Sequence, residues 1–153
     1  MIENNWITLV KPNKVDYKIS DNKKFGTVVI EPLEKGFGTT LGNALRRVLL
    51  SSLQGTAISS IKINGVLHEF STIDGVREDV TDIIMNLKNV TFNSKSNHSQ
   101  KLSLNVKGPK EVLSSDFEDN PEVEIVDKDA VIMNVDSNRE VNLEIFLDVD
   151  KGY

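Results

Sequence analysis

The second half of the chain contains short apolar runs with no helical pattern between them. The clearest run is 141–149, in which an apolar residue occupies every second position, and 102–106 alternates in the same way. Two further runs, 122–126 and 130–135, lie between them. Alternation with a period of two is typical of a strand with one buried face. Parallel neighbours need long crossover connections, usually helices, so this order of runs predicts mostly antiparallel strands.

The first half of the chain predicts two hairpins. The runs 15–20 and 27–31 are rich in β-branched residues and flank a short polar segment. The runs 58–63 and 66–70 flank an Asn-Gly dipeptide at 64–65. That dipeptide suits a tight turn, because both turn positions need a positive φ.

Two segments carry the apolar period of a helix. The first, 41–53, follows a glycine-containing segment, and Thr39 or Thr40 is its expected N-cap. The second, 76–88, follows Asp74, which we expect to cap it. Its apolar residues repeat at helical spacing: Val76, Val80, Ile83, Ile84 and Leu87. Together these elements predict an α+β protein with hairpins, a mostly antiparallel sheet and two main helices.

The charge of the chain is distributed unevenly. The formal net charge is −5; residues 1–110 carry 15 basic and 10 acidic side chains, whereas 111–150 carry 2 basic and 13 acidic. Proteins that bind nucleic acid usually have a basic surface, because release of counterions from the phosphates dominates that affinity. We therefore expect no direct contact with nucleic acid from this segment. Any work on nucleic acid would pass through partner proteins.

The composition also bounds the location of the protein. No stretch approaches the roughly 20 apolar residues that span a bilayer, and residues 1–10 lack the pattern of an export signal. The chain has no cysteine, which fits a reducing compartment. We expect a cytoplasmic protein that is not embedded in a membrane.

The residues that could carry chemistry are few. The only histidines are His68 and His98. His68 and Glu69 resemble the start of a zinc-protease helix, but position 72, where the second histidine would stand, is Thr72. The serines lack a nucleophile motif beside a histidine. We expect no catalytic residue and no metal site.

Three glycines stand ahead of and inside the first helix: Gly36, Gly38 and Gly42. A glycine-containing segment before a helix can hold a phosphate through backbone N–H groups. Neither of the two common phosphate-binding spacings is present here. We interpret these glycines as allowing a tight turn and close packing, and we expect no cofactor.

The helix at 41–53 has two different faces. One broad apolar stripe is most simply a core face: Leu41, Ala44, Leu45, Val48 and Leu49. Leu50 lies on the opposite side, with Asn43, Arg46 and Arg47 around it. An apolar residue among arginines on an outward face resembles an interface hot spot, although single exposed leucines are common. Met85 has a similar outward position on the second helix.

Two long motifs carry a resemblance to a known family. Residues 33–52 (LEKGFGTTLGNALRRVLLSS) resemble the signature of the bacterial RNA polymerase alpha subunit, and 64–86 (NGVLHEFSTIDGVREDVTDIIMN) resemble the segment that follows it. The dipeptide at 11–12 and the segments 122–126 and 151–153 resemble the same family in the same order. The resemblance covers nearly the whole chain.

The resemblance implies a function in assembly. In that family two alpha N-terminal domains form a homodimer, and the dimer is the platform for the beta and beta-prime subunits. Catalysis by DNA-directed RNA polymerase, a nucleotidyltransferase, belongs to those larger subunits. The family motif that matches Arg46 and Arg47 contributes to dimerisation and to beta docking, and the beta-contacting positions match Arg47 and Leu50. Lys88 matches a position associated with beta-prime.

The resemblance also implies a domain organisation. Residues 1–54 match the first half of a discontinuous dimerisation subdomain, and 55–153 match a subdomain inserted into it. The family chain continues past the motif at 151–153 to finish the dimerisation subdomain and to reach a DNA-binding domain, and the sequence does not include that part. Two other functions stay open: a free-standing interaction module with the same fold, and a small phosphate-binding enzyme.

Overall fold

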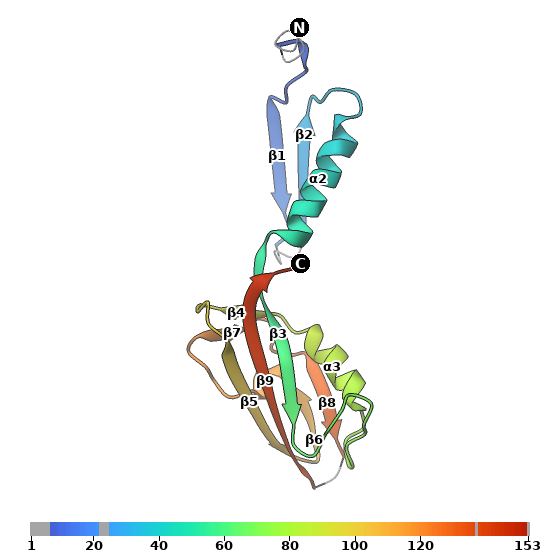
Figure 1. The fold of residues 1–153 in the computed structure, drawn as a ribbon, viewed down its shortest axis with the longest axis vertical. Helices are drawn as coiled ribbons and strands as arrows, with labels where there is room; N and C mark the ends of the chain where they lie inside the picture. Colours follow the sequence, from blue (N-terminus) through green and yellow to red (C-terminus); the bar gives the residue numbers. More distant parts are fainter. Residues whose placement is uncertain (1–6, 22–24, 137, 153) are drawn as a thin grey trace. The chain divides into compact units, whose positions relative to one another are not determined.

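The chain divides into two compact units, Met1–Ser52 and Leu53–Tyr153. A computed structural model describes residues 7–21, 25–136 and 138–152 (Figure 1). Among the described residues, the first unit contains a hairpin and the helix α2, and the second contains a larger sheet, a small sheet and the helix α3. The predicted α+β class with two main helices and mostly antiparallel strands is confirmed.

The hairpin of the first unit consists of β1 (Lys14–Ile19) and β2 (Gly26–Glu31). The strands are antiparallel, with Val15 opposite Ile30. Lys14 forms ion pairs at 2.8 Å with Asp16 on the same strand and at 3.6 Å with Glu31 opposite it on β2. The predicted first hairpin is confirmed, while most of the polar segment between its strands lies outside the described residues.

Helix α2 (Phe37–Ser51) begins four residues before the predicted start. Its N-cap is Gly36, which has a φ of 90° and no side chain to cap the helix. Glycine adopts this left-handed conformation without a steric cost, so the chain turns into the helix earlier than the threonines. The predicted cap at Thr39 or Thr40 is therefore wrong. The helix ends at Ser51, two residues before the predicted end at 53, and strand β3 begins at Gln54.

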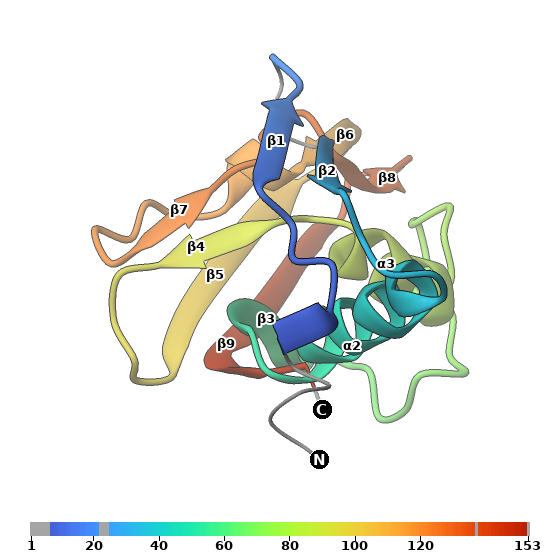
Figure 2. The same ribbon diagram turned by 90° about the horizontal axis from the view of Figure 1, so that it is seen from above.

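The second unit is built on a five-stranded antiparallel sheet. Its order is β5-β9-β3-β4-β7, and a separate two-stranded sheet pairs β6 with β8. Figure 2 shows β5, β9 and β3 side by side. The bounds are β3 Gln54–Ile63, β4 Phe92–Ser94, β5 Gln100–Lys107, β6 Lys110–Leu113, β7 Val123–Ile125, β8 Val131–Val135 and β9 Glu140–Lys151, with a 3₁₀ turn at Ser114–Asp116.

One core lies between the large sheet, the small sheet and helix α3 (Val80–Lys88). Strand β9 directs every second side chain into it: Val141, Leu143, Ile145 and Leu147 are buried. Helix α3 buries Val80, Ile83 and Leu87 and packs against β8 and β3. The apolar alternation of 141–149 and the apolar stripe of the second helix therefore have the buried faces that the sequence predicts.

The segment before α3 is extended rather than helical, so the predicted start at Val76 is wrong. Val76 pairs with Val135 of β8 in an isolated bridge, and the N–H of Arg77 donates to the carbonyl of Asn134 at 2.9 Å. The cap is Asp79, not Asp74: its carboxylate accepts from the N–H of Asp82 at 2.7 Å. Pairing with β8 competes with the helix for these backbone groups, and the helix begins where the pairing ends.

The second predicted hairpin is wrong. Gly65 does adopt a positive φ of 82°, and the N–H of Val66 donates to the carbonyl of Ile63 at 3.2 Å. The chain after this turn forms no strand, and Leu67 is 97% exposed. Strand β9, rather than the segment 66–70, pairs with one edge of β3.

Candidate functional site

The apolar stripe of α2 is exposed. No residue of this helix is buried: Leu45 is 47% and Val48 is 51% exposed, and Leu41 is half-buried. The interpretation of this stripe as a core face is therefore wrong for the chain as described. The physical reason is that no described element covers it. An uncovered apolar face of this kind is a binding surface or a site of self-association.

Three of the predicted partner-binding residues share α2. Leu50 is 63% exposed, and Arg46 and Arg47 are exposed as well. Within the described ranges neither guanidinium forms an ion pair. Since arginine is enriched at protein interfaces, the two exposed arginines suit a protein partner. Their role in binding beta remains a prediction.

The hairpin carries a second exposed apolar surface, which the sequence reasoning missed. Val15, Tyr17 and Ile19 alternate along β1, and Val28 lies opposite Tyr17 on β2. All four side chains are exposed. The alternation was visible in the sequence and predicted the strands, but it does not reveal whether the apolar face is covered within the chain.

The fourth predicted residue, Lys88, lies in the second unit at the end of α3. It is exposed, and Met85, one turn earlier, is 55% exposed opposite the buried stripe. Lys88 lines a groove of 210 Å³ with apolar walls that include Ile61 and Ile84. The expected exposure of Met85 is confirmed. The role of Lys88 toward beta-prime stays a prediction.

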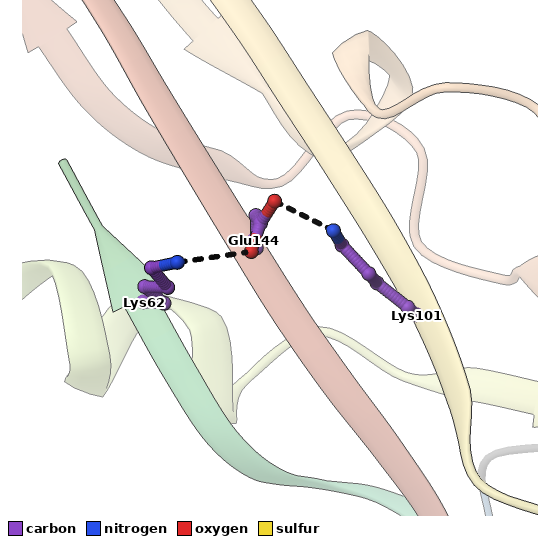
Figure 3. Close-up of polar contacts among 3 residues, drawn as sticks. All are labelled: Lys62, Lys101 and Glu144. Atoms are coloured by element: carbon purple, nitrogen blue, oxygen red, sulfur yellow. Dashed lines mark hydrogen bonds and ion pairs between the residues drawn. The ribbon is translucent and has the colours of Figure 1, made fainter.

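The outer face of the large sheet carries an ion triad. Glu144 on β9 lies between Lys101 on β5, at 2.6 Å, and Lys62 on β3, at 4.0 Å (Figure 3). The hydrogen bond from Lys101, and the charge of both lysines, hold the pKa of Glu144 below its ordinary value. Hydrogen bonds from the Ser59 and Ser99 hydroxyls lower the pKa of Asp148 further along β9. The ion pairs of Glu144 link β9 to β5 and β3.

The pair His68 and Ser71 is the nearest approach to a nucleophile beside a base. The Ser71 oxygen lies 3.5 Å from Nδ1 of His68. The Ser71 hydroxyl also donates to the backbone carbonyl of His68. That contact is a local turn bond, and it occupies the proton that a base would have to remove. His68 lies in a loop, so the strand predicted for it is wrong.

A cleft of 630 Å³ lies in the second unit. It lies beside β7 and the segment after the 3₁₀ turn, and its lining mixes Lys95 and Lys128 with Glu118, Asp119 and Glu124. Opposite charges side by side give the cleft no single sign. In the described part of the chain, no group of three or more His, Cys, Asp or Glu side chains is arranged to hold a metal ion.

The described residues form an α+β chain that exposes apolar side chains and two arginines on α2. Residues 61–153 match the RNA polymerase Rpb3/RpoA insert domain, and the chain belongs to that family. The match confirms the resemblance to the N-terminal domain of the bacterial RNA polymerase alpha subunit. It gives the chain a role in RNA polymerase assembly and in transcription. No helix among the described residues is long and apolar enough to cross a membrane.

Proposed function

We propose that the chain is a non-catalytic assembly subunit of DNA-directed RNA polymerase in the cytoplasm. It forms a homodimer and provides the platform on which the beta and beta-prime subunits bind. The observation that carries the proposal is the surface of α2, where apolar side chains and two arginines are exposed together. The family match over 61–153 supports it.

Dimerisation is assigned to the first unit. The stripe of α2 and the apolar face of the hairpin expose large side chains that a second copy would cover. Burial of apolar surface is the main favourable term in protein association. This assignment matches the proposed organisation, in which 1–54 is part of a dimerisation subdomain and 55–153 is inserted into it.

Docking of the large subunits is assigned to exposed residues on both helices. Arg47 and Leu50 on α2 contact beta, with Arg46 beside them at the dimer surface. Lys88 on α3 contacts beta-prime. The ammonium of Lys88 has no ion pair with a described residue, so it is available to a partner carboxylate.

The test is assembly from purified components. Sedimentation of the chain should show a dimer, and mixing with beta and then beta-prime should give a complex that elutes as one species. The variant Leu45→Glu places a charge in the α2 stripe and should give a monomer, whereas the same change at exposed Val126 of the second unit should leave the dimer intact. A chain that stays monomeric and captures neither subunit would refute the proposal.

A further inference from the structure

Strand β3 has a free edge. On one side it pairs with β9 along its length, from Gln54 to Ile63. On the other side it pairs with β4 only at Thr56. On that second side, no strand of the described residues lies beside 60–63. An open strand edge presents N–H and C=O groups that another chain can pair with.

The register identifies the backbone groups at this edge. The N–H of Asn64 donates to the carbonyl of Asn142 at 3.1 Å, so this residue pair is hydrogen-bonded across the ladder. Hydrogen-bonded pairs alternate with non-bonded ones in an antiparallel ladder. The backbone N–H and C=O of Lys62 therefore point toward β9. Those of Ile61 and Ile63 point toward the open side. Among the described residues, no bond outside the β3–β9 ladder reaches the backbone of Ile61.

A groove runs along this edge, between β3 and α3, which lie side by side in Figure 1. It consists of a hollow of 210 Å³ and a hollow of 270 Å³, and both are lined by Ile61 and Ile84. The first also reaches Ile58 and Leu87, and the second reaches Val66. The walls are therefore mainly apolar over the length of the groove.

The two ends of the groove differ in charge. Lys88 lines the hollow nearer the start of β3, and Glu69 lines the hollow nearer its end. Lys62 also borders the groove, but its ammonium is on the outer face of the sheet, toward Glu144 (Figure 3). An acidic group of a ligand is therefore attracted to the Lys88 end and repelled from the Glu69 end.

We propose that this groove binds an extended peptide, which adds to β3 as an antiparallel strand. Binding between a strand edge and a helix is an established mode of peptide recognition, in which main-chain hydrogen bonds give affinity and alternate side chains fill pockets. The C-terminus of an antiparallel peptide lies beside the start of β3, which is the Lys88 end of the groove. The peptide should therefore carry its acidic residues at its C-terminal end. This inference rests on the second unit alone and does not depend on dimerisation or on the beta contact; it shares Lys88 with the proposed beta-prime surface, so the probe is tested without beta-prime present.

The direct test follows backbone amides by NMR. The probe is an acetylated octapeptide that alternates threonine and valine and ends in two aspartates. Binding should slow exchange of the Ile61 amide and leave that of Lys62, which faces β9, unchanged. The backbone N–H groups of alternate probe residues point toward β3 and away from it. N-methylation of the residues whose N–H groups point toward β3 should abolish binding, and N-methylation of the other residues should not. Absence of binding at millimolar probe, or binding insensitive to N-methylation, would overturn the proposal.

The charge is tested separately. Lys88→Glu should weaken binding of the aspartate-ended probe by about fivefold, as expected for an exposed ion pair. A probe that ends in two lysines should bind this variant better than the parent chain. Lys107→Glu, at an exposed position on β5, is the matched control and should change neither affinity. Equal losses in both variants would contradict the placement of the acidic end at Lys88.

Discussion

The carboxylate of Glu78 accepts two hydrogen bonds from Asn134, one from the backbone N–H at 2.6 Å and one from Nδ2 at 2.7 Å. Partial burial raises the pKa of Glu78, but the two hydrogen bonds outweigh it and hold the pKa below the ordinary glutamate value. These bonds fasten the extended segment before α3 to β8. They couple the helix to the small sheet.

Replacing Glu78 by glutamine should destabilise the second unit. The substitution removes the charge and turns an N–H donor of the glutamine toward a donor of Asn134. The expected loss in the free energy of unfolding is about 1–3 kcal/mol at pH 7. Because the folded pKa is lowered, the carboxylate stabilises the fold above the unfolded pKa of about 4.3 and loses this effect as the pH falls through the folded pKa. Urea unfolding at pH 7 and pH 3 should therefore show a smaller difference between variant and parent at pH 3.

The control for this measurement is Glu111→Gln, at an exposed position of β6. It should match the parent at both pH values within about 0.5 kcal/mol. An equal loss for Glu78→Gln at pH 7 and pH 3 would show that the charge of Glu78 contributes nothing.

Truncation of the two helices should have different costs. Leu87 on α3 is 1% exposed, so Leu87→Ala should lower the free energy of unfolding by about 2–5 kcal/mol. Leu45 on α2 is exposed, and Leu45→Ala should change the stability of the monomeric chain by less than about 1 kcal/mol. Circular dichroism melts of dilute protein measure both. A large loss for Leu45→Ala under these conditions would mean that α2 is covered after all.

Substitutions at the beta surface should separate binding from folding. Arg47→Ala and Leu50→Ala should leave the melting temperature unchanged, because both side chains are exposed, and each should weaken capture of beta by about 1–3 kcal/mol. A titration with purified beta measures the loss. Lys107→Ala serves as a control on the second unit. Unchanged affinity for beta in both helix variants would remove these residues from the interface.

The two units should differ in local stability. Helix α2 has no buried residue, whereas α3 packs three side chains in the core. Amide hydrogen exchange reports the local opening free energy. We expect rapid exchange over 37–51 and strong protection over 80–88 in dilute protein, and slower exchange over 37–51 as the concentration rises. Equal protection of both helices in a monomer would favour a free-standing module over an assembly subunit.

The sequence predicted those elements whose pattern is local. The strict alternation of 102–106 and 141–149 has a simple physical cause, since one face of each strand lies on the core. The strands β4 and β6 were missed because their short segments, 92–94 and 110–113, do not alternate apolar and polar residues. The hairpin at 66–70 was predicted from a good turn dipeptide, but the partner of β3 is β9, at the far end of the sequence. No local signal reveals that choice.

The candidate site was predicted less completely than the fold. A helical wheel separates an apolar stripe from a mixed face, and it correctly placed Leu50 and Met85 at the surface. It cannot show whether the stripe itself is covered, because burial depends on the elements that pack against it. For the same reason the sequence did not predict that apolar side chains of the hairpin, such as Tyr17, are exposed. The free edge of β3 depends on pairing between distant segments and was invisible.

The pairing of Gln54 with Lys151 has a consequence for any domain that surrounds the second unit. The chain enters and leaves this unit on neighbouring strands, about 5 Å apart. The entropy of closing a loop depends on bringing its two ends together. Because the folded unit already holds its two ends together, it would constrain a surrounding domain as a short hairpin loop does. A host fold can therefore accept or lose this unit with little change in the geometry of its own backbone.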